Sequence, residues 1–163
     1  YRRAIELRPN YSEAHNNLGQ LLAKMGRLDD AVKEFTIALD NLLYREPFIA
    51  RCNRGDALVR MGRRDEGVAD LRGCLSNQPK YCHGQRVLGR IYLSEGKTKE
   101  ALEHLGLYAR HCDSVADAHY QLGLGYVKSG DATRARAAFE KCEMVGKESP
   151  LAGECRKSRE MLQ

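Results

Sequence analysis

Residues 116–139, ADAHYQLGLGYVKSGDATRARAAF, contain the pattern from which the fold is predicted. In this stretch Gly123 is followed seven residues later by Gly130, then by a small residue, Ala135, and by a large one, Phe139. A glycine ends a helix readily because it adopts the left-handed conformation, and small residues let two helices approach closely. The stretch therefore predicts a helical hairpin whose second helix carries a small and then a large apolar residue.

The same pattern occurs four times along the chain. Its first glycines are separated by 36, 34 and 34 residues and are Gly19, Gly55, Gly89 and Gly123. A second glycine follows each of them after seven residues, and the small and large positions keep the same phase. Such a period indicates stacked hairpins, each of which buries its apolar faces against its neighbours.

This pattern resembles the tetratricopeptide repeat. The first and fourth copies match its small and large positions at Leu18, Gly19, Leu22, Ala31, Phe35, Ala38, Leu122, Gly123, Tyr126, Ala135 and Phe139. The resemblance implies an all-α fold, a right-handed α-solenoid of tetratricopeptide repeats with a terminal capping helix. The phase of the glycines predicts a single repeat domain over residues 1–163. Its parts are the end of a truncated repeat (1–11), full repeats (12–45, 48–81, 82–115 and 116–149) and a capping helix (150–163).

Composition argues against a transmembrane helix in this chain and against nucleic acid as its partner. Its mean hydropathy is −0.57, and no apolar run approaches the roughly 18 to 20 residues that a transmembrane helix needs. The net charge of +5 arises from 27 basic and 22 acidic residues that alternate along most of the sequence. Interleaved charges are typical of solvated helix faces, so nucleic acid is not an expected partner.

In tetratricopeptide repeats the first helices line a concave wall that holds a peptide or a segment of another protein. The resemblance therefore implies a non-catalytic binding protein without cofactor or metal. The predicted partner-binding residues are Asn16, Gln20, Lys24, Asp56, Arg60, Arg86, Arg90 and Tyr120. The three arginines of this set favour an acidic partner segment, although exposed arginines are also ordinary surface residues.

Arg54 departs from the repeat pattern because it replaces the leucine that the repeat buries. A buried guanidinium needs a carboxylate partner or an outlet to solvent. We therefore expect that this helix is rotated, or that Arg54 reaches solvent or meets a carboxylate such as Asp56 or Glu66.

Two residues are inserted between the first and second repeats, within the stretch NLLYREP at residues 41–47. This stretch lies between NNLG at residues 16–19 and NRG at residues 53–55. It resembles the DPLYPxP segment between the NNYG and NAG helices of the lipoprotein pilotins of type IV pili. The match runs from residue 12 to the final helix, although Leu43 stands where that family has proline.

The resemblance to pilotins implies a place and a partner. It implies an outer-membrane lipoprotein that faces the periplasm through an acylated N-terminal cysteine, which lies outside this sequence. The partner would be the type IV pilus secretin, whose localisation and multimer assembly the protein would promote. The alternative is a general tetratricopeptide adaptor that binds peptide segments of another complex.

The chain contains six cysteines and no CxxC pair: Cys52, Cys74, Cys82, Cys112, Cys142 and Cys155. In an antiparallel hairpin the start of the first helix lies beside the end of the second, so Cys82 can meet Cys112. Folding back of the final helix would bring Cys142 to Cys155 in the same way, which favours an oxidising compartment. Alternatively, Cys74 and Cys142 fill the repeat's small position as free thiols.

A zinc site formed by Cys82, His83, His111 and Cys112 is not expected. Adjacent helical residues point about 100° apart, so four such side chains do not converge.

Overall fold

The computed structural model describes residues 1–162, apart from the side chain of Arg2. It consists of helices joined by short connections, and no strand occurs in the described residues. None of the helices within them combines the length and the apolar run that crossing a membrane requires. The helices are α1 Arg2–Leu7, α2 Ser12–Lys24, α3 Leu28–Asp40, α4 Pro47–Arg60, α5 Arg64–Asn77, α6 Cys82–Ser94, α7 Thr98–His111, α8 Ala116–Lys128, α9 Ala132–Gly146 and α10 Pro150–Glu160.

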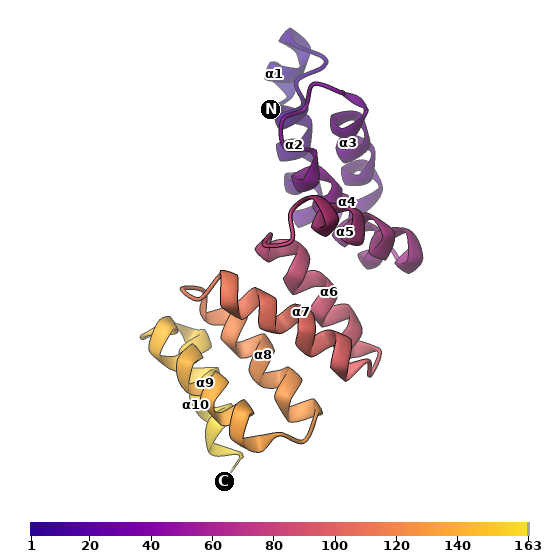
Figure 1. Ribbon diagram of the computed structural model, residues 1–163. Helices are drawn as coiled ribbons and strands as arrows, with labels where there is room; N and C mark the ends of the chain where they lie inside the picture. The colour runs from indigo at the N-terminus through magenta and orange to yellow at the C-terminus, as the bar shows by residue number, and fades with distance from the viewer. Residues whose placement is uncertain (163) are drawn as a thin grey trace. The chain divides into compact units, whose positions relative to one another are not determined.

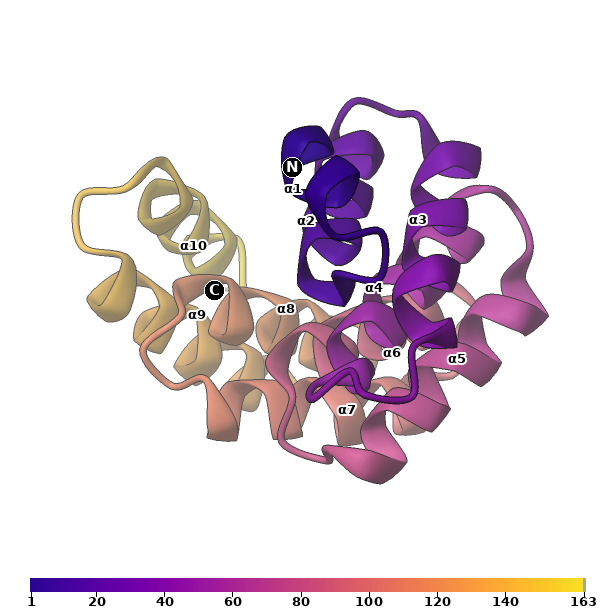
Figure 2. The ribbon, with the colours of Figure 1, turned by 90° about the horizontal axis from the view of Figure 1, so that it is seen from above.

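Consecutive helices pack as antiparallel pairs within two compact units (Figure 1). Unit 1, Tyr1–Pro79, contains the pairs α2 with α3 and α4 with α5, and α1 packs against α2. Unit 2, Lys80–Gln163, contains the pairs α6 with α7 and α8 with α9, which Figure 2 shows side by side. The final helix, α10, packs on α9 and α8 and so covers the last hairpin.

A glycine with positive φ follows the first helix of each pair. The φ angles lie between +73° and +83° at Gly26, Gly62, Gly96 and Gly130. In the first of these turns, the backbone N–H of Arg27 donates to the carbonyl of Leu22 at 2.9 Å, and Gly26 N–H donates to Ala23 at 3.2 Å. This pair of bonds satisfies carbonyls that the helix end leaves without an intrahelical partner, so the chain reverses direction at low cost.

The core of each hairpin is a large side chain lying against a glycine of the partner helix. A Cβ atom at Gly19 would come within 2.6 Å of the Phe35 ring, and one at Gly123 within 2.5 Å of the Phe139 ring. Both rings are 1% exposed. Because aromatic rings fill the space beside Gly19 and Gly123, the two helices of each of these hairpins pack at short range.

Candidate partner-binding faces

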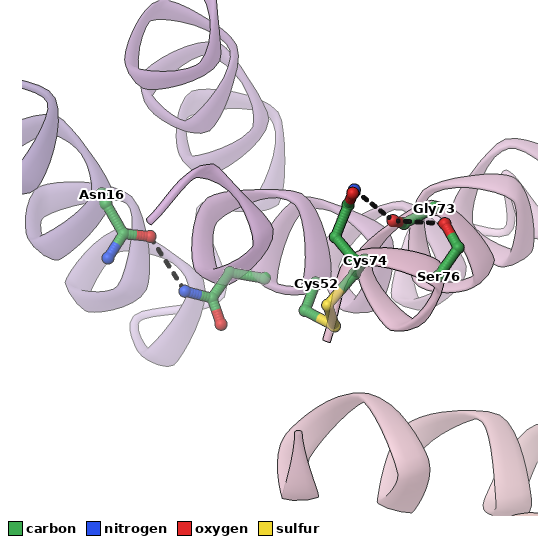
Figure 3. Close-up of a disulfide and its surroundings, with 7 residues drawn as sticks. Asn16, Cys52, Gly73, Cys74 and Ser76 are labelled. Atoms are coloured by element: carbon green, nitrogen blue, oxygen red, sulfur yellow. Dashed lines mark hydrogen bonds between the residues drawn. A yellow bond between two sulfur atoms is a disulfide. The ribbon is translucent and has the colours of Figure 1, made fainter. Parts of the chain in front are cut away.

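In unit 1, the predicted binding residues lie on α2 and α4, and two hydrogen bonds join these helices. The Asn16 side chain is 5% exposed, and its Oδ1 accepts a hydrogen bond from Nδ2 of Asn53 at 2.9 Å (Figure 3). At the other end of the helices, Nη2 of Arg60 donates to the carbonyl of Ala23 at 2.9 Å. Asn16 therefore serves mainly to hold α4 against α2.

Three other predicted residues of unit 1 are accessible to a partner. Gln20 and Asp56 are half-buried, and Lys24 is exposed. Arg60 is exposed as well, although its guanidinium lies over the carboxyl end of α2, where a cation is favourable. The face of unit 1 is thus polar, with hydrogen-bonding groups and charges of both signs.

Arg54 has a different partner from either carboxylate expected from the sequence. Its Nε donates to Oδ2 of Asp70 at 2.6 Å and its Nη2 to Oδ1 at 3.0 Å, while Nη1 donates to the Thr36 hydroxyl at 3.2 Å. The expectation of Asp56 or Glu66 is therefore corrected to Asp70, which lies one turn of α5 beyond Glu66. Glu66 instead pairs with Arg63, at the rim of a pocket of about 370 Å³ beside Arg54.

In unit 2, the predicted binding residues Arg86 and Arg90 lie on α6, and Arg86 faces Asp117 of α8. Nη1 of Arg86 is 4.0 Å from Oδ2 of Asp117. That carboxylate also accepts hydrogen bonds from the Tyr108 hydroxyl at 3.1 Å and from Nε2 of Gln121 at 3.0 Å. Burial, together with the negative charge of Asp117, raises the pKa of Tyr108 to about 12.

The charge of unit 2's face follows from these contacts. Asp117 accepts hydrogen bonds from Tyr108 and Gln121 and lies 4.0 Å from the Arg86 guanidinium, whereas Arg90 and Lys128 are exposed. Neither of these two cations has an ion-pair or hydrogen-bond partner within residues 1–162. The face of α6 and α8 therefore carries positive charge that a partner's carboxylates can neutralise.

Tyr120, the remaining predicted binding residue, belongs largely to the core of unit 2. It is half-buried, and its ring centroid lies 5.9 Å from that of Phe139. The Tyr120 ring therefore packs between α8 and α9, and the side chain remains partly accessible to a partner.

The inserted stretch at residues 41–47 forms an ordered turn between α3 and α4. Nδ2 of Asn41 donates to the Asn10 carbonyl at 3.0 Å and to the Ser12 hydroxyl at 2.8 Å, and its Oδ1 accepts from the Leu43 N–H at 3.0 Å. Tyr44 is buried against Ala38 and Ala50. Between these anchors, the turn presents two leucines to solvent, with exposed fractions of 97% at Leu42 and 87% at Leu43.

An apolar pocket of about 360 Å³ lies between α1 and α2 and was not expected from the sequence. Its two arginines are each paired with a nearby acidic residue, Arg3 with Glu6 and Arg27 with Asp30. The residues lining the pocket are Tyr1, Arg3, Leu18, Leu21, Leu22, Met25 and Arg27. Unit 1 thus has a small concave apolar surface besides its polar face.

Three disulfides join the six cysteines, each within one pair of packed helices. Cys82 is bonded to Cys112 and Cys142 to Cys155, with Cα atoms 6.3 and 6.1 Å apart. The third bond, Cys52 to Cys74, has Cα atoms 5.5 Å apart and joins α4 to α5 (Figure 3). This pair was not predicted, because Cys74 stands at a small-residue position that a free thiol can fill. The only available signal was the placement of both cysteines on the two helices of one hairpin.

Models of known protein families match most of the chain and describe helical repeats of the kind seen in the structure. Three family models described as tetratricopeptide repeat match residues 1–33, 52–114 and 116–144, which together make up more than half of the chain. No curated protein matches the chain.

Several solved structures share the fold at low sequence identity. PilW, a widely conserved type IV pilus biogenesis factor, is 22% identical with a TM-score of 0.79, over 94% of this chain and 70% of its own. A thermophilic tetratricopeptide protein of Thermus thermophilus is 22% identical with a TM-score of 0.73, over 93% of this chain and 80% of its own. YrrB, a tetratricopeptide protein with an unusual peptide-binding site, is 20% identical with a TM-score of 0.69, over 96% of this chain and 80% of its own.

These likenesses establish the fold class predicted from the sequence, an all-α solenoid of helical hairpins. With the repeats matched along the chain, the protein belongs to the tetratricopeptide-repeat proteins.

Proposed function

We propose that this protein is a non-catalytic binding scaffold that acts as a pilotin of type IV pili. It binds the secretin and promotes the secretin's localisation and multimer assembly at the outer membrane. The likeness to PilW supports a role in pilus biogenesis. The observation that carries the secretin proposal is the ordered turn at residues 41–47, whose sequence resembles the corresponding segment of pilotins.

The turn has the properties of a contact surface. Leu42 and Leu43 are almost fully exposed, whereas Asn41 and Tyr44 on either side are fixed by hydrogen bonds and burial. Exposed leucine side chains are hydrated unfavourably in the free protein. Burying them against a partner removes apolar surface from water and so lowers the free energy of the complex. A turn that is already ordered loses little conformational entropy on binding, so its leucines are suited to anchor a partner.

The face of unit 2 supplies the polar part of the proposed interaction. Arg90 and Lys128 offer positive charge, next to the Arg86 guanidinium that faces Asp117. Such a face attracts an acidic segment and steers its approach, while the apolar contacts provide much of the affinity.

The proposed location is the periplasmic side of the outer membrane, reached through a lipid on a cysteine upstream of Tyr1. Three disulfides support an oxidising compartment, because disulfides persist in the periplasm and are rare in the cytosol.

A general adaptor is the second candidate, in which the same faces bind peptide segments of another complex. The likeness to YrrB, a tetratricopeptide protein with an unusual peptide-binding site, favours this possibility. The two candidates differ in whether the secretin is the partner.

Binding of the purified chain to the secretin of the same organism tests the proposal. We expect saturable binding that Leu42→Ser with Leu43→Ser weakens by about tenfold or more, as removal of two anchor residues does. Met144→Ser is the matched control, because Met144 is also exposed but lies in α9 of unit 2. Absence of secretin binding by the unaltered chain would overturn the pilotin proposal and leave the adaptor.

Charge reversal tests the face of unit 2 separately. Arg86→Glu with Arg90→Glu is expected to weaken secretin binding and to reduce its dependence on salt. Lys99→Glu with Arg110→Glu is the control, since it reverses the same number of charges at exposed cations on α7 and not on the proposed face. Equal effects of the two changes would show that net charge, and not the face, governs binding.

A further inference from the structure

The three disulfides differ in their exposure to solvent. Four of the cysteines are 0% exposed: Cys52, Cys74, Cys142 and Cys155. In the remaining bond, Cys112 is 6% exposed and Cys82 is half-buried. A thiol in solution can therefore approach the sulfur of Cys82 more easily than any of the four fully buried sulfurs.

The position of the bond in the helices accounts for this difference. Cys82 is the first residue of α6, and Cys112 is the C-cap of α7. The other cysteines lie inside α4, α5, α9 and α10, where the helix continues on both sides. Local opening requires least free energy at helix ends, so the bond between Cys82 and Cys112 can be reached without unfolding a hairpin.

Charged residues beside the bond favour the approach of an anion. Lys80 lies two residues before Cys82 and Arg110 two residues before Cys112, and both are exposed. The neighbouring carboxylate of Asp113 is paired with Lys141 at 3.3 Å. The attacking species in disulfide exchange is a thiolate, which positive neighbours attract.

We infer that the bond between Cys82 and Cys112 is a site of thiol–disulfide exchange, open to small thiols such as glutathione. The thiolate attacks Sγ of Cys82, a new sulfur–sulfur bond forms, and the bond to Cys112 breaks. The electron pair leaves on Sγ of Cys112, which takes a proton from solvent. A second thiolate then attacks the small-molecule sulfur of this mixed disulfide, the bond to Cys82 breaks, and Sγ of Cys82 leaves with the electron pair and takes a proton from solvent. Two small thiols are thereby oxidised to one disulfide, and the protein disulfide is reduced to two thiols. The site is independent of the proposed function, since the exchange needs no partner protein.

Timed reduction of the folded, oxidised chain tests this inference. The protein is incubated with reduced glutathione under native conditions, quenched with acid and alkylated, and each cysteine is then identified by mass spectrometry. We expect Cys82 and Cys112 to be labelled about tenfold faster than the other four cysteines, because burial restricts access to those sulfurs. The intermediate should carry glutathione on Cys82.

Two controls distinguish protection of the disulfides by the folded structure from differences in their intrinsic reactivity. In denaturant, the three bonds should be reduced at similar rates, because the protection has gone. The double variant Cys82→Ser with Cys112→Ser should take up no glutathione in the folded state. Equal rates for all three bonds under native conditions, or earlier reduction of either buried bond, would overturn the inference. Six free thiols in the oxidised protein would overturn it as well.

Discussion

Arg54 of α4 and Asp70 of α5 form a two-pronged ion pair at a position where the other repeats carry leucine. The two hydrogen bonds measure 2.6 and 3.0 Å, and the side chains are only 24% and 14% exposed. The hydrogen bond to Asp70 is the main cause that raises the pKa of Arg54, so the guanidinium stays charged. Through Thr36, the same guanidinium also contacts α3, so a single polar cluster joins three consecutive helices.

Removing one partner of this pair should destabilise unit 1. Asp70→Ala leaves a largely buried guanidinium without its carboxylate, which costs about 2–3 kcal/mol of unfolding free energy. Adding Arg54→Leu recreates the combination of Leu122 and Ala138 found at the same positions of the fourth repeat. The double variant should return to within about 1 kcal/mol of the original, because an apolar pair can replace a buried ion pair.

Urea unfolding measures these differences. The control is Glu66→Gln, which removes an exposed ion pair with Arg63 and should leave the unfolding midpoint unchanged. A double variant no more stable than Asp70→Ala alone would contradict the interpretation.

The surroundings of two glycines, Gly55 on α4 and Gly106 on α7, predict opposite effects of their replacement by alanine. A Cβ at Gly55 would lie 2.8 Å from the carbonyl oxygen of Gly67, a backbone atom that cannot swing away. Gly55→Ala should therefore lower stability by about 3 kcal/mol. At Gly106 of α7, a Cβ would meet nothing within 4 Å, so Gly106→Ala should raise stability by about 0.5–1 kcal/mol. Thermal unfolding distinguishes the two, and destabilisation by Gly106→Ala would be inconsistent with the packing described.

The raised pKa of Tyr108 predicts that the folded chain loses stability at alkaline pH. Its pKa in the folded chain is about 12, compared with 10.0 for an ordinary tyrosine, because of burial and the charge of Asp117. The folded chain thus holds the phenolic proton more tightly than the unfolded chain does. This contribution is complete below pH 10 and is lost as the pH rises from 10 to about 12.

Replacement by phenylalanine should remove that part of the pH dependence. Tyr108→Phe should lose less stability between pH 10 and 12 than the original chain, and its ultraviolet titration should lack the latest tyrosine ionisation. Tyr11→Phe, at an exposed tyrosine, is the control that should keep both features. A late ionisation that persists in Tyr108→Phe would assign it to another residue.

The hairpins could be predicted from the sequence because their glycines have local physical requirements. Gly130 is needed because its φ is positive, and Gly123 because the Phe139 ring lies close to it. Both requirements therefore appear in the sequence as glycines at a fixed spacing. The pairing of Cys82 with Cys112 also follows from hairpin geometry, because both residues lie at the ends of their helices.

Contacts that depend on side-chain direction could not be predicted in this way. Arg54 was expected near Asp56 or Glu66, but only the packing of α4 on α5 brings Asp70 to it. Asn16 lies at a position expected to face a partner, yet the approach of α4 buries it against Asn53. Binding surfaces between helices are set by these interhelical distances, which a repeat pattern does not contain.

The most direct test of the proposed pilotin function is to delete the gene and analyse the secretin in membranes. Heat-stable secretin multimers and monomers are separated by gel electrophoresis and detected with an antibody. If the protein promotes secretin assembly, the multimers disappear while the monomer remains, and expression of the unaltered chain in its full-length form restores them. Secretin multimers present at an unchanged level in the deletion strain would contradict the proposed function.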